Sequence, residues 1–479
     1  MSTAAGARVT LLSQWVRFAI QLGGFVLLSR LLSPADFGVF AMVSVIVAFA
    51  SLVADFGLSL AGLQAPSLSQ RQKSSLFYAN LVAGIVGALL LVAAGPVLAL
   101  FYNEPEVVSL SLLLAVPLVL SSAAVQFRVE INRAGRFRAL AIQDVVSAGG
   151  GLAVAVCAAL AGWGFWALGV QLVAQAAIVL VLAVSQARWM PTLAGSWAES
   201  RGLLAFGGNS LLNQLAYITS RSVDAMMVGR DQGATDLGLY NRSTQLVNMA
   251  FQQLVSPLTR VVLPRLTSTA KDLPIFMREL LGVQTVVAYS MLAVVSAMAA
   301  LAPPLVVTVF GEDWAGMGSL VQILCIGAAF QSVGYVYYWV MLARGRTALL
   351  LFSELPGRAV MVVGALVCAQ ISTNAVAWAV TLGQVVIFAG SSLTLRRAGV
   401  SSAPLIGVAV RPAVVFVVAF SVGVAVAALV QAPPWVEGVA IAAAWALSAA
   451  AALAVPTVRS DVVAAIAVVR GRSSLGQVR

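Results

Sequence analysis

One stretch of the chain places five polar residues on a single helical face. Residues 205–228 could cross a hydrocarbon core of about 30 Å, which takes about 20 residues. A charge at the bilayer centre costs at least about 2.5–3.5 kcal/mol, so this face should line a wet cavity or a packed interior. Steps of four, four, four and three residues put the polar side chains on one side of an α-helix: Asn209, Asn213, Tyr217, Arg221 and Asp224.

Arg17 is the most informative single charge, because no carboxylate stands three or four positions from it. Gln14 and Gln21 share its helical face. A guanidinium in a cavity could bind phosphate oxygens through two parallel hydrogen bonds, which match its planar donors. The alternatives are an ion pair with a carboxylate of another helix, or a side chain that reaches toward the membrane interface.

Two further arginines have a carboxylate close by in the same segment. Asp224 follows Arg221 by three positions, and Arg358 follows Glu354 by four. At these spacings a local ion pair can neutralise both groups. Such arginines either face a cavity or serve a structural ion pair. For Glu354 and Arg358 we favour the ion pair.

Arg242 and Asp144 are the remaining intramembrane charges that we single out. Arg242 lies near the end of its segment, where its side chain could extend to the interface instead of contacting a phosphate. Asp144 corresponds to Glu354 at an offset of 210 residues. Asp144 could bind a proton or Na⁺, or it could be the partner of Arg17, which we favour. We expect no cofactor, no metal site and no catalytic residues.

The elements that must position these residues are transmembrane helices. The chain of 479 residues is 61% hydrophobic and 9% charged, whereas about 25% of a soluble domain is charged. Apolar windows and their breaks predict about 14 transmembrane helices between residues 9 and 456. Tyr335, Tyr337, Tyr338 and Trp339 end one of these helices and are typical of an interfacial aromatic belt.

The basic residues predict the orientation of the chain. Most of the 28 Lys and Arg, including Arg128, Arg133 and Arg136, fall on one side of the membrane if the N-terminus is inside. Only Arg30 and Arg230 fall in the opposite loops. This asymmetry predicts that both termini are cytoplasmic. No loop is long enough for a soluble catalytic domain.

An internal duplication organises the helices. Residues 7–40 align without a gap with residues 207–240, and Arg133–Arg136 align with 343–346 at an offset of 210. We therefore predict two six-helix lobes, 1–190 and 191–400, in the same orientation, followed by two more helices and a basic tail in 401–479. Parallel repeats of this kind place a binding site between the halves. Asp36, Gly38, Asp236 and Gly238 should cap and bend the starts of two equivalent helices.

Several of these motifs resemble the polysaccharide transporter family, which includes Wzx-type O-antigen, colanic acid and teichuronic acid exporters. The family belongs to the MATE-like (MOP) superfamily, with multidrug MATE exporters and the lipid II flippase. The resemblance covers the first twelve predicted helices. Its two D-x-G-x-[FY] elements are diagnostic as a pair. The motifs are the opening helix with Gln14 and Arg17, then LLSPADFG at 31–38, DFGL at 55–58 and DLGLYNR at 236–242.

The resemblance implies an all-α, two-lobed bundle around a cavity, in a bacterial cytoplasmic membrane. It also implies translocation of a polyprenyl-pyrophosphate-linked oligosaccharide to the outer leaflet by alternating access. The partners would be this lipid-linked oligosaccharide, membrane lipids and candidate polymerase or assembly proteins, with no nucleic acid. We assign the pyrophosphate to the basic residues Arg17, Arg221, Arg242 and Arg358. The polar cavity residues for the glycan are Gln14, Gln21, Asn209, Asn213 and Tyr217, although amides also join helices.

Three other functions remain open. A lipid II-type flippase or a MATE-like drug exporter would share the architecture, but a drug exporter should favour acidic, apolar cavities for cationic drugs. Four intramembrane arginines favour an anionic cargo. A membrane oligosaccharide polymerase would be an enzyme, and such enzymes generally work at a sizeable outer loop. Here the outer loops are short and histidine is absent.

Overall fold

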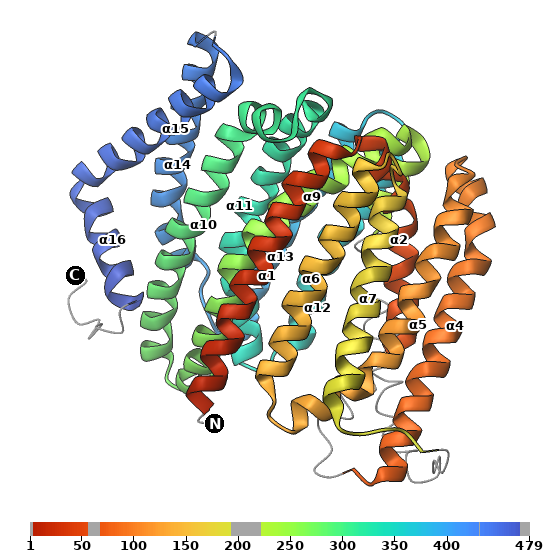
Figure 1. The fold of residues 1–479 in the computed structure, drawn as a ribbon. Coiled ribbons are helices and arrows are strands. Elements are labelled where there is room, and N and C mark those ends of the chain that lie inside the picture. The colour runs from red at the N-terminus through yellow and green to blue at the C-terminus, as the bar shows by residue number, and fades with distance from the viewer. Residues whose placement is uncertain (1–2, 56–67, 193–221, 431, 470–479) are drawn as a thin grey trace. The chain divides into compact units, whose positions relative to one another are not determined.

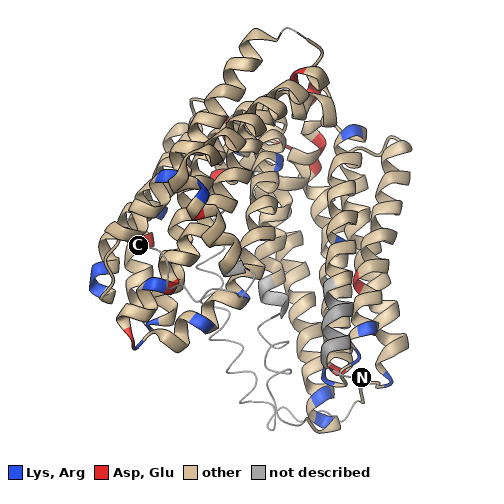
Figure 2. Cartoon of the chain, turned by 90° about the vertical axis from the view of Figure 1, so that its left-hand side faces the viewer, with Lys and Arg blue, Asp and Glu red and all other residues tan. Residues whose placement is uncertain are grey.

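The structure is a computed structural model that describes residues 3–55, 68–192, 222–430 and 432–469. All the regular secondary structure within these ranges is helical. Eleven of the helices are long and apolar enough to cross a membrane. Figure 2 shows long uncharged stretches of helix between the Lys, Arg, Asp and Glu residues. The prediction of an all-α integral membrane fold is therefore confirmed.

Residues Met1–Gly238 form the first compact unit. Helix α4 packs against α2 and α5, α6 packs against α7 and α1, and α5 also packs against α7. These helices are drawn from red to yellow in Figure 1. Their bounds are α1 (Thr3–Leu31), α2 (Pro34–Asp55), α4 (Gln70–Tyr102), α5 (Glu106–Arg133), α6 (Phe137–Leu160), α7 (Trp166–Ala187) and the beginning of α9 (Val223–Thr269).

Residues Leu239–Arg479 form the second unit. Helix α10 packs against α11, α13 packs against α11 and α12, and the appended α14, α15 and α16 all pack on α10. The predicted basic tail thus begins with a helix. The bounds after α9 are α10 (Leu273–Phe310), η1 (Glu312–Trp314), α11 (Gly316–Ala343), α12 (Thr347–Cys368), α13 (Thr373–Thr394), η2 (Leu395–Ala398), α14 (Ala403–Leu429), α15 (Pro434–Ala451), η3 (Ala452–Ala454) and α16 (Pro456–Val469).

The duplication is visible in the helix ends. Helices α5 and α11 end 210 residues apart, and α6 and α12 also begin 210 residues apart. Both turns pass through a glycine in the left-handed region, Gly135 with φ 65° and Gly345 with φ 67°. A glycine after the last helical turn lets following amides bond back to the orphan carbonyls. Here Arg136 N–H donates to the Ile131 carbonyl at 3.1 Å, and Arg346 N–H to the Met341 carbonyl at 2.8 Å.

The helices of the two repeats also break at matched positions near residues 33 and 233. Helix α1 ends before Ser33, and α9 is interrupted at Gly233, where φ is 85° and ψ is −176°. Ser33, rather than Asp36, is the N-terminal cap of α2. Its hydroxyl accepts a hydrogen bond from Asp36 N–H at 3.2 Å, and its own N–H donates to the Asp36 carboxylate at 2.9 Å. This reciprocal pair is a capping box, so Asp36 has the second role in the cap.

Gly38 and Gly238 lie where two helices cross, a role that the sequence pattern did not predict for them. A Cβ atom added to Gly38 would lie 1.7 Å from the carbonyl oxygen of Ala234. One added to Gly238 would lie 1.8 Å from the carbonyl oxygen of Pro34. Only the absence of a side chain permits this approach of α2 to the second part of α9.

The aromatic residues at the end of α11 do not form an interfacial belt. Tyr337 and Trp339 are fully buried in an apolar cluster of the second unit, with Phe251 of α9 and Phe276 of α10. The indole N–H of Trp339 donates to the hydroxyl of Thr259 at 3.1 Å. The end of α9 and the beginning of α10 pack around the end of α11, where Leu266 and Phe276 join the same cluster.

Candidate functional site

The polar residues predicted to form a cluster on α1 are exposed. Gln14, Arg17 and Gln21 are all exposed. Among the described residues Arg17 has no ion-pair partner. Helix α1 contacts α6 further along, where Ile20 lies 4.0 Å from the position of a Cβ on Gly149 and Gly24 faces Leu152. An uncompensated guanidinium on this helix is available to an anionic ligand.

Asp144 pairs with Arg128. The prediction that Asp144 pairs with Arg17 was wrong. The Arg128 Nη2 atom lies 2.9 Å from Asp144 Oδ1, and the two side chains are 33% and 31% exposed. The prediction counted Arg128 among the basic residues of the cytoplasmic loops and helix ends, but α5 continues through Arg133 and carries Arg128 against α6. Because α1 and α6 run parallel, with residue 20 beside residue 149, Arg17 and Asp144 lie at about the same level in the first unit.

Glu354 and Arg358 form an ion pair within α12. The Arg358 Nη2 and Nε atoms lie 2.6 and 3.1 Å from Glu354 Oε2. The side chains are 26% exposed for Arg358 and 24% for Glu354, so the pair is only partly covered. Glu354 stands seven residues into α12, and Asp144 stands seven residues into α6. The two repeats therefore hold a carboxylate at matched positions, each paired with an arginine at a position that differs between the repeats.

Arg242 is buried rather than extended toward an interface. It is 7% exposed in α9, and its Nη1 atom donates to the amide oxygen of Gln245 at 2.9 Å. Asp224 lies in the first turn of α9, where a negative charge is favourable to the helix dipole. Other predicted site residues lie outside the described residues, so their convergence with Arg17 stays a prediction: Asn209, Asn213, Tyr217 and Arg221.

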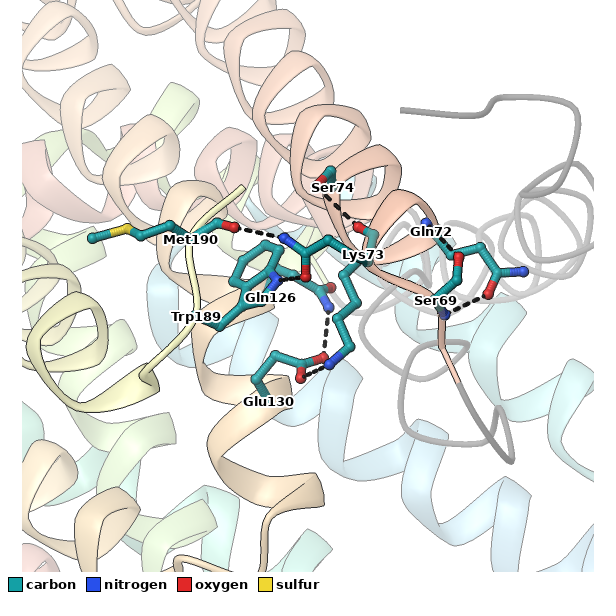
Figure 3. A network of polar contacts seen from close by, with 9 residues as sticks. Ser69, Gln72, Lys73, Ser74, Gln126, Glu130, Trp189 and Met190 are labelled. Atoms are coloured by element: carbon teal, nitrogen blue, oxygen red, sulfur yellow. Dashed lines mark hydrogen bonds and ion pairs between the residues drawn. The ribbon is translucent and has the colours of Figure 1, made fainter. Parts of the chain in front are cut away.

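Figure 3 shows a polar network that sequence reasoning missed, at the end of the first unit where α4 begins and α5 ends. Lys73 Nζ lies 2.5 Å from Glu130 Oε2, and the Gln126 amide donates to Oε1 of the same carboxylate at 3.3 Å. Gln70 accepts the indole N–H of Trp189 at 2.7 Å. The available signal was Glu130 itself, a lone carboxylate among basic residues.

Some of the basic residues at helix ends are structural. Arg136 donates to the carbonyl of Gln186 at the end of α7. Arg344 donates to the carbonyls of Ala398 at 2.7 Å and Ala270 at 3.0 Å. Helix ends leave carbonyls without intrahelical partners, and cations are favourable there. Such arginines stabilise helix ends by hydrogen bonding to their carbonyls, and they are poor candidates for ligand binding.

The remaining charged groups suit the recognition of an anion. Arginine in a low-dielectric surrounding binds phosphate or carboxylate oxygens strongly. Within the described ranges, no group of three or more His, Cys, Asp or Glu could hold a metal ion.

Comparisons with known proteins agree with this membrane architecture. A family model described as "Polysaccharide biosynthesis protein" matches residues 27–319. The teichuronic acid biosynthesis protein TuaB of Bacillus subtilis is 25% identical over 80% of both chains. The succinoglycan biosynthesis transport protein ExoT of Rhizobium meliloti is 25% identical, with 83% of this chain and 82% of ExoT covered. The lipopolysaccharide biosynthesis protein WzxC of Escherichia coli is 23% identical, with 72% and 70% covered.

A solved structure shares the fold across nearly the whole chain. The inward closed conformation of the lipid II flippase MurJ superposes with a TM-score of 0.72, covering 93% of this chain and 98% of that one. Sequence identity is 8%, so this likeness concerns the fold alone.

Proposed function

This chain belongs to the polysaccharide biosynthesis protein family, and on that premise we propose that it is a flippase for a lipid-linked oligosaccharide. It moves a polyprenyl-pyrophosphate-linked glycan across the bacterial cytoplasmic membrane for assembly of a cell-surface polysaccharide. It is a transporter and not an enzyme. Both termini are cytoplasmic, as the distribution of Lys and Arg favours.

The observation that carries this proposal is the open cationic face of α1 in a family of polysaccharide biosynthesis proteins. Arg17 is exposed and has no ion-pair partner among the described residues. An isolated cation at membrane depth is costly unless water or an anion compensates it. A pyrophosphate supplies that compensation, while Gln14 and Gln21 on the same face offer hydrogen bonds to sugar hydroxyls.

Transport requires that the substrate bind the inward and outward forms differently, since a ligand shifts an equilibrium only by its differential affinity. In this mechanism the two lobes, 1–190 and 191–400, alternate between the two forms, and Arg17, Arg221, Arg242 and Arg358 bind the pyrophosphate. Asp144, Asp224 and Glu354 balance those charges. Polymerase or assembly proteins are candidate partners that receive the glycan.

The test measures lipid-linked glycan in cells that lack this gene. We expect the intermediate to accumulate on the cytoplasmic leaflet, wild type to clear it and Arg17→Ala to clear it poorly. Arg138→Ala is the matched control, because Arg138 is exposed at the start of α6. Single units on the outer leaflet would instead indicate a polymerase. No accumulation on either leaflet would indicate a drug exporter, and both results would overturn the proposal.

A further inference from the structure

We propose that Arg128 is an anion-binding residue of the first unit and that Asp144 occupies its guanidinium when no substrate phosphate is bound. Arg358 and Glu354 form the equivalent pair of the second unit. The inference rests on the proposed function, because the anion is the pyrophosphate of the lipid-linked substrate. It adds Arg128 to the site and gives the two carboxylates the role of competing internal ligands.

The first argument is the repetition. Asp144 and Glu354 are 210 residues apart, as are the starts of the helices that carry them. Each has an arginine partner, but from a different place: Arg128 belongs to α5, whereas Arg358 belongs to the same helix as Glu354. The repeats therefore agree in placing an arginine–carboxylate pair at this level, although they use different arginine positions.

The second argument is exposure. Side chains of both pairs are between 24% and 33% exposed. In the Lys73–Glu130 pair, by comparison, the carboxylate is only 10% exposed, although the lysine side chain is 23% exposed. Partly open pairs can be reached by a ligand without unfolding a helix.

The third argument is the unused hydrogen-bonding capacity of Arg128. Guanidinium has five N–H donors, and in the described part of the chain Arg128 uses one, from Nη2 to Asp144 Oδ1 at 2.9 Å. The remaining donors can bind two phosphate oxygens side by side. Arg17 lies at about the same level on the parallel helix α1, so a second cationic residue stands at that level of the first unit.

The exchange follows from charge. In the empty protein the carboxylate neutralises the arginine, which lowers the cost of keeping it at membrane depth. A pyrophosphate carries more charge and more acceptor oxygens than one carboxylate, so it competes effectively for the guanidinium. The carboxylate then repels the bound anion, which limits the affinity and favours release on the other side of the membrane.

The experiment uses the purified full chain in detergent and two probes, inorganic pyrophosphate and farnesyl pyrophosphate, in titration calorimetry. We expect Asp144→Asn to bind both probes about five- to tenfold more tightly than wild type, since a competing, repelling charge is removed. Arg128→Gln should bind them about tenfold more weakly. Glu354→Gln tests the second unit in the same way, and it also keeps the inference testable if Asp144→Asn does not fold.

The matched control is Glu279→Gln, because Glu279 forms a 2.8 Å ion pair with Arg265 outside the proposed site. It should leave both affinities unchanged, which excludes a general effect of removing one negative charge. A merely structural pair would make Asp144→Asn bind no better than wild type, or worse, and this result overturns the inference.

The two proposals fail in different ways. If deletion cells accumulate the lipid-linked glycan and wild type binds the probes, but neither carboxylate variant binds more tightly, only the inference is wrong. If wild type binds neither probe and no glycan accumulates in the deletion cells, the proposed function is wrong and the inference falls with it.

Discussion

Gly38 and Gly238, 200 residues apart in the chain, make reciprocal backbone contacts. Gly38 faces the carbonyl of Ala234, and Gly238 faces the carbonyl of Pro34. Because Pro34 and Ala234 are also 200 residues apart, the two contacts are equivalent in the two repeats. The absence of a side chain on each glycine lets the backbones approach, as small residues do at crossings of membrane helices. This pair gives the two D-x-G-x-[FY] elements a physical meaning.

Replacing either glycine should separate the helices. In Gly38→Ala the new Cβ would overlap a backbone oxygen, which cannot rotate away as a side chain can. We expect a loss of about 2 kcal/mol or more of unfolding free energy, visible as a lower midpoint of thermal unfolding. Gly23→Ala is the control, because nothing lies within 4 Å of a Cβ added there. Equal midpoints for the two variants would contradict the crossing.

Removing the cation from the network of Figure 3 should also destabilise the first unit. Lys73→Met leaves Glu130, whose side chain is 10% exposed, without its ammonium partner. Because the pair is not wholly buried, we expect a loss of about 2 kcal/mol. The double variant Lys73→Met/Glu130→Gln should recover part of it in chemical denaturation. No recovery in the double variant would mean that the carboxylate was not the source of the loss.

Replacing Arg344 by lysine should lower the stability of the protein. Its two terminal nitrogens reach the carbonyls of Ala398 and Ala270, and its guanidinium lies 5.3 Å from the Phe276 ring centroid. A lysine ammonium cannot satisfy both carbonyls in this planar arrangement. We expect Arg344→Lys to lose about 1–2 kcal/mol, whereas Arg346→Lys, at an exposed position, should not change the melting temperature.

One carboxylate contributes to the attachment of α16, which also packs on α10. Asp461 accepts hydrogen bonds from Arg411 at 3.2 Å and from the Tyr289 hydroxyl at 3.3 Å. Arg411 is about half exposed, so the contribution should be below about 1 kcal/mol. That is enough to loosen a helix of 14 residues. In Asp461→Asn, trypsin should cleave after Arg459 several-fold faster than in wild type. Glu437→Gln serves as the control and should leave this rate unchanged.

The class of protein and its duplication could be predicted from the sequence, because hydrophobic length and helical spacing act along the chain. The same reasoning identified Glu354 and Arg358 as neighbours, since residues four apart meet on one helix. It could not identify Arg128 as the partner of Asp144, because a contact between helices depends on where α5 ends and how it packs on α6. Spacing along the chain also could not place Trp339 in the core or Gly38 at a crossing. Those positions were decided by the tertiary structure, where packed helices exclude solvent and permit backbones to touch.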